Sequence, residues 1–109
     1  MNNFQQVKIR VTVPTDSAEK VRLALGEAGA GKIGNYIHCT TSYPVTGRFL
    51  PQEDANPSVG EVGKMEEVEE VMIEIVCDTI KLEEIIKVLK EVHPYEEPAI
   101  DLVPLMNLN

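Results

Sequence analysis

The sequence is poor in the residues that build disulfide-rich and membrane proteins. Its 109 residues include two cysteines, two histidines and no tryptophan. Cys39 and Cys77 are too few for a disulfide framework and form no CxxC pair. No apolar run is long enough to cross a bilayer, and residues 2–6 do not form a secretory signal. We therefore expect a cytoplasmic protein with reduced thiols and no membrane association.

Basic residues are also few. Ten lysines and arginines stand against 18 aspartates and glutamates, which gives a formal net charge of −8. A phosphate backbone is repelled by such a field, and no basic patch offsets it. We predict that the chain binds no nucleic acid.

Hydrophobic periodicity in the first third predicts a β-α unit. Over residues 7–13 valine and isoleucine alternate with polar residues, the pattern of a strand with one buried face. Over residues 18–28 apolar side chains recur at helical spacing, and Gly29 and Gly31 then supply a stop.

The last third repeats this order. Residues 71–77 alternate as a strand, and residues 82–92 form an amphipathic helix that ends before Pro94. Residues 99–103 predict a last strand that ends at Pro104.

The segment between the two units predicts a strand and an arm. Residues 33–43 are rich in β-formers and should contain a strand. Residues 44–64 carry several prolines and glycines without a helical period, so we expect a protruding arm of short strands and turns. The acidic run over residues 66–70 is typical of a solvated entry to the next strand.

Together these elements predict one α+β domain over residues 1–109. Its fold class is a ferredoxin-like βαβ-βαβ sandwich with an extended β arm, at about 44–64, between the halves. Two helices cover one face of such a sheet, and Met72 and Val76 point to the other. A second subunit is the usual cover for such a face, so we expect a homo-oligomer and favour a trimer.

Five motifs resemble the insert domain of the Nif-three-like (NGG-one-interacting-factor, YqfO type) family. The resemblance extends from about Val7 to Leu105, and the chain looks like a free-standing version of that insert. The insert is similar in fold to CutA, the divalent-cation-tolerance trimer, and to PII-type signalling proteins. The motifs are Gly29-Ala-Gly-Lys-Ile-Gly-Asn-Tyr36, Thr46-Gly-Arg-Phe49, Asn56-Pro57 with Gly60-Glu-Val-Gly63, Glu66-Glu-Val-Glu-Glu-Val71 and His93-Pro-Tyr-Glu-Glu-Pro-Ala99.

The resemblance implies a CutA/PII-like binding domain rather than a hydrolase. Longer family members carry a dinuclear metal site on the halves that flank the insert, and no segment of this chain corresponds to those halves. The hydrolase-like activity attached to the longer proteins is therefore not carried over.

Two loops after predicted helices supply the candidate ligand-binding residues. The first holds Gly31, Asn35 and Tyr36, and the second holds Tyr95 and Glu96. The glycine-rich loop follows a helix and precedes a strand, the reverse of a phosphate-binding P-loop. The structural alternative makes Asn35 a turn residue and places Tyr36 and Tyr95 in packing contacts.

Metal binding is a further hypothesis for His38, Cys39, His93 and Glu97. Imidazole and thiolate suit zinc or copper(I), and a divalent metal is the only cofactor that these residues suggest. In a strand, however, His38 and Cys39 face opposite sides, which disfavours chelation of one ion by both. Cys39 is otherwise a small buried hydrophobe, and His93 is the better candidate ligand.

Arg48 and Phe49 in the arm suit a contact with a partner or between subunits. The sequence carries no cofactor fingerprint and no partnered nucleophile, so we assign no catalytic residue. The favoured function is a non-catalytic, oligomeric ligand- or metal-binding regulatory module. The alternatives are a protein-interaction adaptor without a ligand and a small metal-assisted hydrolase that uses His38, His93, Glu96 and Glu97.

Overall fold

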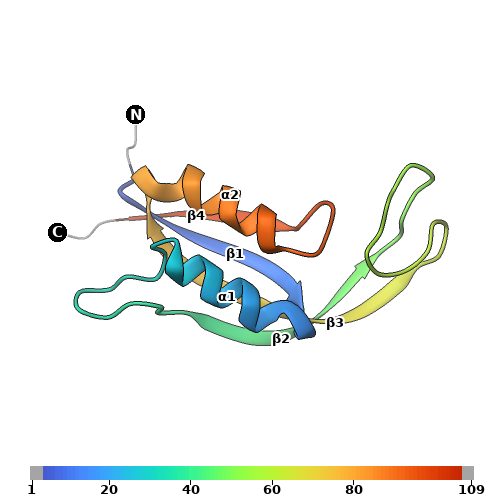
Figure 1. The fold of residues 1–109 in the computed structure, drawn as a ribbon, viewed down its shortest axis with the longest axis horizontal. Coiled ribbons are helices and arrows are strands. Elements are labelled where there is room, and N and C mark those ends of the chain that lie inside the picture. Colours follow the sequence, from blue (N-terminus) through green and yellow to red (C-terminus); the bar gives the residue numbers. More distant parts are fainter. Residues whose placement is uncertain (1–3, 107–109) are drawn as a thin grey trace.

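The computed structural model describes residues 4–106 and has the predicted α+β architecture. Two helices lie side by side over one face of a four-stranded antiparallel sheet (Figure 1). Short 3-10 turns, Thr15–Ser17 and Thr79–Lys81, lead into the helices. The elements are β1 (Gln6–Pro14), α1 (Ala18–Glu27), β2 (Thr41–Phe49), β3 (Glu66–Asp78), α2 (Leu82–Val92) and β4 (Ile100–Leu105).

The strand order is β2-β3-β1-β4, and every neighbouring pair is antiparallel. Each β-α-β half is therefore split by a strand of the other half, which is the ferredoxin-like arrangement expected from the sequence. Ile9 pairs with Ile75 on one side and Leu102 on the other, so this register puts apolar positions of three strands on one face.

The core lies between this face and the helices. Val21 and Leu25 of α1 and Ile85 and Leu89 of α2 are fully buried against the alternate apolar residues of β1 and β3. Cys77 belongs to the same cluster, and burial raises the pKa of its thiol. The spacings of three and four in the sequence thus correctly identified the buried helical stripes.

The hairpin formed by β2 and β3 extends past the helices at one end of the sheet (Figure 1). The prediction of a strand within residues 33–43 was largely wrong, because β2 begins only at Thr41 and continues through Pro44 and Gly47. An edge strand tolerates both residues, since one side of its backbone has no partner strand. The first residues of the predicted arm, 44–49, are therefore regular strand, and the rest of it lies in the loop between Phe49 and Glu66.

Two other boundaries differ for related reasons. β4 continues through Pro104 to Leu105, because it is the other edge strand and needs no N–H from this proline on its free side. β3 begins at Glu66, five residues before the predicted start, because the acidic run pairs with β2. The acidic run is thus part of the sheet.

The face opposite the helices carries Met72 and Val76, as the sequence predicted. Met72 pairs with Thr12, and Val76 pairs with Lys8, on the strand positions that alternate with the core. We call this surface the open face. Within residues 4–106, neither helix is long and apolar enough to span a membrane.

Candidate functional site

The loop after α2 begins with a buried histidine whose two ring nitrogens are both engaged. The Nδ1 atom of His93 accepts a hydrogen bond from the backbone N–H of Tyr95 at 3.1 Å. The Nε2 atom lies 2.8 Å from the backbone oxygen of Thr12, so it must be the protonated nitrogen that donates to this carbonyl. Burial lowers the pKa of His93, although the Thr12 carbonyl and the Glu70 charge act in the opposite direction.

Tyr95 connects this loop to the hairpin. Its hydroxyl donates a hydrogen bond to Oε2 of Glu70 at 2.7 Å, and its ring lies 5.9 Å from that of Phe49 and 5.1 Å from that of His93. Burial raises the pKa of Tyr95, and the hydrogen bond to Glu70 raises it further. The phenol therefore acts as a hydrogen-bond donor at neutral pH.

A cavity of about 440 Å³ lies beside this hydrogen bond, between the hairpin and the loop after α2. Thr12, Gly47 and Glu70 contribute to it from strand positions of the open face. Apolar walls come from the hairpin and its loop. These wall residues are Phe49, Leu50, Pro51, Ala55, Pro57 and Val59.

Two polar contacts fix the walls of the cavity. Glu96 accepts a hydrogen bond from the backbone N–H of Asn56 at 3.1 Å, which joins the two loops. The Arg48 guanidinium lies 3.5 Å from the Glu67 carboxylate of the paired strand. The predicted partner-contact residues Arg48 and Phe49 thus both line this cavity, together with Tyr95, Glu96 and Glu97.

The other predicted ligand-binding residues lie at the opposite end of the sheet, where the loop after α1 protrudes (Figure 1). Ile33 and Tyr36 exchange two backbone hydrogen bonds of 2.9 Å around a tight turn that contains Asn35. Tyr36 is 74% exposed at the tip of this loop. Gly31 is buried, with its N–H 2.7 Å from the Val76 carbonyl.

His38 packs against the end of α1 at this same distant end. Its ring occupies the space over Gly26 that a Cβ atom would fill, and its Nε2 lies 3.5 Å from Glu27. Cys39 is half-buried, and its N–H donates to the Gly31 carbonyl at 2.8 Å.

The two loops therefore do not meet within one chain. The loop after α1 and the loop after α2 lie at opposite ends of the sheet (Figure 1). The first holds His38 and Cys39, and the second holds His93 and Glu97. Among residues 4–106, no three His, Cys, Asp or Glu side chains converge in an arrangement that would hold a metal ion. A metal at His93 would also have to replace one of its two hydrogen bonds.

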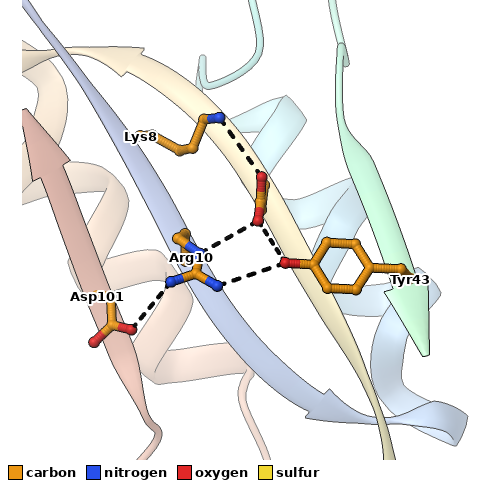
Figure 2. A network of polar contacts seen from close by, with 5 residues as sticks. Lys8, Arg10, Tyr43 and Asp101 are labelled. Atoms are coloured by element: carbon orange, nitrogen blue, oxygen red, sulfur yellow. Dashed lines mark hydrogen bonds and ion pairs between the residues drawn. The ribbon is translucent and has the colours of Figure 1, made fainter. Parts of the chain in front are cut away.

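A separate polar network crosses the open face, with Lys8, Arg10, Tyr43 and Asp101 around Glu74 (Figure 2). The Glu74 carboxylate accepts a 2.7 Å hydrogen bond from the Tyr43 hydroxyl and lies 3.3 Å from Nε of Arg10. Arg10 also reaches Asp101 at 3.7 Å, so the network joins all four strands. The Tyr43 hydrogen bond is the largest of the effects that lower the pKa of Glu74.

Sequence reasoning missed the central residue of the cavity. Glu70 belongs to the acidic run that was predicted to be solvated, yet it is only 5% exposed. One available signal was the position of Glu70 in the strand. Alternate residues of a strand point to the same face, so Glu70 lies on the face that carries Met72 and Glu74. The contacts that bury it come from Tyr95 and Gly47, which no local pattern connects to it.

Comparison with known proteins relates the chain to a segment of larger proteins. No protein-family model matches it. It is 46% identical over 100 residues to the GTP cyclohydrolase 1 type 2 homolog of Halalkalibacterium halodurans, which covers 92% of this chain and 27% of that relative. The crystal structure of a Bacillus cereus protein related to NIF3 matches with a TM-score of 0.82 and 46% identity, over 98% of this chain and 27% of that one.

The fold is also that of a complete smaller protein. CutA1 from the psychrotrophic bacterium Shewanella sp. SIB1 matches with a TM-score of 0.71 and 25% identity, over 97% of this chain and 86% of that one. The chain thus has a CutA-like fold and resembles a part of NIF3-related proteins, as its motifs indicated. It spans about a quarter of the length of the curated relatives it matches.

Proposed function

We propose that this chain is a binding module that holds a small organic ligand in the cavity between the hairpin and the loop after α2. The observation that carries the proposal is the cavity itself, whose volume of about 440 Å³ lies in the range of ligand sites. Its walls are mostly apolar, and a few polar groups converge on it from fixed positions. This combination is typical of sites that bind small molecules.

The polar groups are held in place before any ligand arrives. Tyr95 is fixed at its backbone by His93 and at its hydroxyl by Glu70, and Glu96 is fixed by Asn56. Such preorganisation lowers the entropy cost of binding. These residues suit recognition better than catalysis, because the two described aliphatic hydroxyls of the lining, Thr12 and Ser58, form no side-chain hydrogen bond to a base.

Native mass spectrometry of the gently purified protein tests this proposal. We expect a population with added mass that is released on denaturation. Ala55→Trp should remove the added mass, because Ala55 lines the cavity and a large ring would fill it. Leu23→Trp, on an exposed position of α1 outside the cavity lining, is the control and should keep the ligand. If the parent carries no added mass and binds nothing in a metabolite screen, the proposal is wrong.

We also propose that the protein assembles as a homotrimer through the open face, as the resemblance to CutA implies. Met72 and Val76 leave apolar surface on this face, and a subunit contact would cover it. Met72→Asp should therefore shift the oligomer towards monomer in light scattering while circular dichroism stays unchanged. Thr46→Asp, an exposed position on the other face of β2, should leave the oligomer intact. A monomeric parent protein would contradict the assembly.

An adaptor function is the alternative, and one surface favours it. Ile33, Tyr36 and Ile37 are all at least 60% exposed at the tip of the loop after α1. Apolar side chains grouped on a protruding loop suit a protein partner. Loss of a co-purifying protein from an Ile37→Glu variant, with no ligand in the cavity, would support this alternative.

A further inference from the structure

Glu70 is the most deeply buried carboxylate that lines the cavity. It is 5% exposed, and its Oε2 atom accepts the hydrogen bond from Tyr95. Its Oε1 atom lies over Gly47, in space that a Cβ atom at this position would occupy. The absence of a side chain at Gly47 thus leaves the space that this oxygen occupies.

The Oε1 atom of Glu70 has no partner among the described residues. No ion pair to Glu70 occurs between residues 4 and 106, and Tyr95 supplies the only side-chain hydrogen bond that it receives there. Every described polar side-chain atom that is fully shielded from solvent has a hydrogen-bond partner. Because Oε1 has none, it must keep some surface that is open to solvent. Oε1 lies over Gly47, and Glu70 and Gly47 both line the cavity, which puts this oxygen at the cavity wall. A buried carboxylate oxygen in this position favours a bound donor or cation.

The other charged residues of the lining are mostly acidic. Glu96 and Glu97 also line the cavity, against a single cation, Arg48. The Arg48 guanidinium is already paired with Glu67 and is largely exposed. An anionic ligand would meet three carboxylates here, whereas a cationic one would be attracted.

The walls indicate what kind of cation fits. A metal ion needs several converging ligands, and none of the described side chains form such a group. Phe49 and Tyr95 instead present aromatic surface beside prolines and a valine, which suits an apolar body.

We propose that the ligand is a small organic amine with an apolar or aromatic body, and that Glu70 binds its ammonium group. This inference rests on the proposed binding function and assigns its ligand class. Oε1 of Glu70 accepts from the ammonium, while Tyr95 holds Oε2 and so fixes the carboxylate. Glu96 and Glu97 add negative potential around the bound ligand.

Three probes of nearly equal size test the inference by NMR titration at neutral pH. They are phenethylamine, which is a cation, 2-phenylethanol, which is neutral, and 3-phenylpropionate, which is an anion. We expect phenethylamine to bind at least about tenfold more tightly than the alcohol, as one hydrogen bond to a charged group would give. The propionate should bind most weakly.

Glu70→Gln should remove the preference for the amine while keeping an acceptor for the Tyr95 hydroxyl. Glu69→Gln is the matched control, because the neighbouring side chain has the same charge but is exposed on the opposite strand face. This variant should keep the preference. Shifted amides should belong to residues that line the cavity.

The outcomes separate the two proposals. If all three probes bind equally well to the parent, the cavity is a binding site but the amine inference is wrong. If the amine preference survives in Glu70→Gln, the role assigned to Glu70 is wrong. If none of the probes binds and no metabolite is found by mass spectrometry, the proposed binding function itself falls.

Discussion

The Tyr95 hydroxyl and the Glu70 carboxylate lie 2.7 Å apart, and their hydrogen bond joins the loop after α2 to strand β3. The two residues stand 25 positions apart in the sequence. Their contact closes one side of the cavity and keeps a buried carboxylate oriented. Stability and the ligand binding that we propose should therefore be coupled at this bond.

Tyr95→Phe should lower the free energy of unfolding by about 1–3 kcal/mol. The variant keeps the ring beside Phe49 and His93 but leaves the buried Glu70 carboxylate without a donor. Urea unfolding followed by circular dichroism measures the change. Tyr36→Phe is the matched control, since Tyr36 is 74% exposed and its loss of a hydroxyl should change stability by less than about 0.5 kcal/mol. Equal effects of the two substitutions would refute the importance of the Glu70 hydrogen bond.

The sequence carried most of the information about the core and little about this bond. Strict alternation in β1 and spacings of three and four in α2 follow directly from which side chains are buried. β2 lacks such alternation, because it is an edge strand with exposed residues, so its start was misplaced. Glu70 looked solvated because the residues that bury it are distant along the chain.

The sequence named only part of the cavity lining, for the same reason. The motif that begins at His93 does line a cavity with Tyr95 and Glu96, and the arm supplies Phe49 to the same cavity. The glycine-rich loop lies at the other end of the sheet (Figure 1). The distance between this loop and the cavity depends on the direction in which each helix runs over the sheet. The glycine-rich motif itself does not encode that direction.

Protonation of His93 should destabilise the fold as the pH falls. Burial lowers the pKa of His93 below its usual 6.5, so the unfolded chain takes up a proton at higher pH than the folded protein. The contribution of His93 to stability is then complete above pH 6.5 and is lost as the pH falls from there towards the lowered folded pKa. A second proton on the folded ring would break the hydrogen bond that Nδ1 accepts from Tyr95.

Urea midpoints measured across this pH range test the prediction. His93→Gln should reduce the dependence of stability on pH, because Gln does not titrate. If the urea midpoint of His93→Gln changes with pH as steeply as that of the parent, a group other than His93 causes the pH dependence.

Tyr43→Phe should raise the pKa of Glu74 towards its ordinary value. The Tyr43 hydrogen bond is the largest effect that lowers this pKa, ahead of the contacts from Arg10 and Lys8. A carboxyl with a lowered pKa stabilises the fold above its unfolded pKa and loses that contribution as the pH falls through the folded value. The variant should therefore lose less stability in acid. Side-chain carboxyl NMR titration measures the shift. Asp101→Asn, whose ion pair is with Arg10 and not with Glu74, should leave most of it unchanged.

Gly31→Ala should destabilise the protein more than Gly34→Ala does. Both glycines have left-handed backbones, with φ of +80° and +57°, so an alanine costs about 1–2 kcal/mol at either position. At Gly31 the new Cβ would also lie 2.8 Å and 2.9 Å from backbone atoms of Cys39, whereas at Gly34 it meets nothing within 4 Å. The Cys39 backbone is held by its hydrogen bond to Gly31 and cannot easily move. We expect about 2–5 kcal/mol for Gly31→Ala in urea unfolding. Equal losses in the two variants would show that the Cys39 segment shifts freely, and that Gly31 is not required for this close approach.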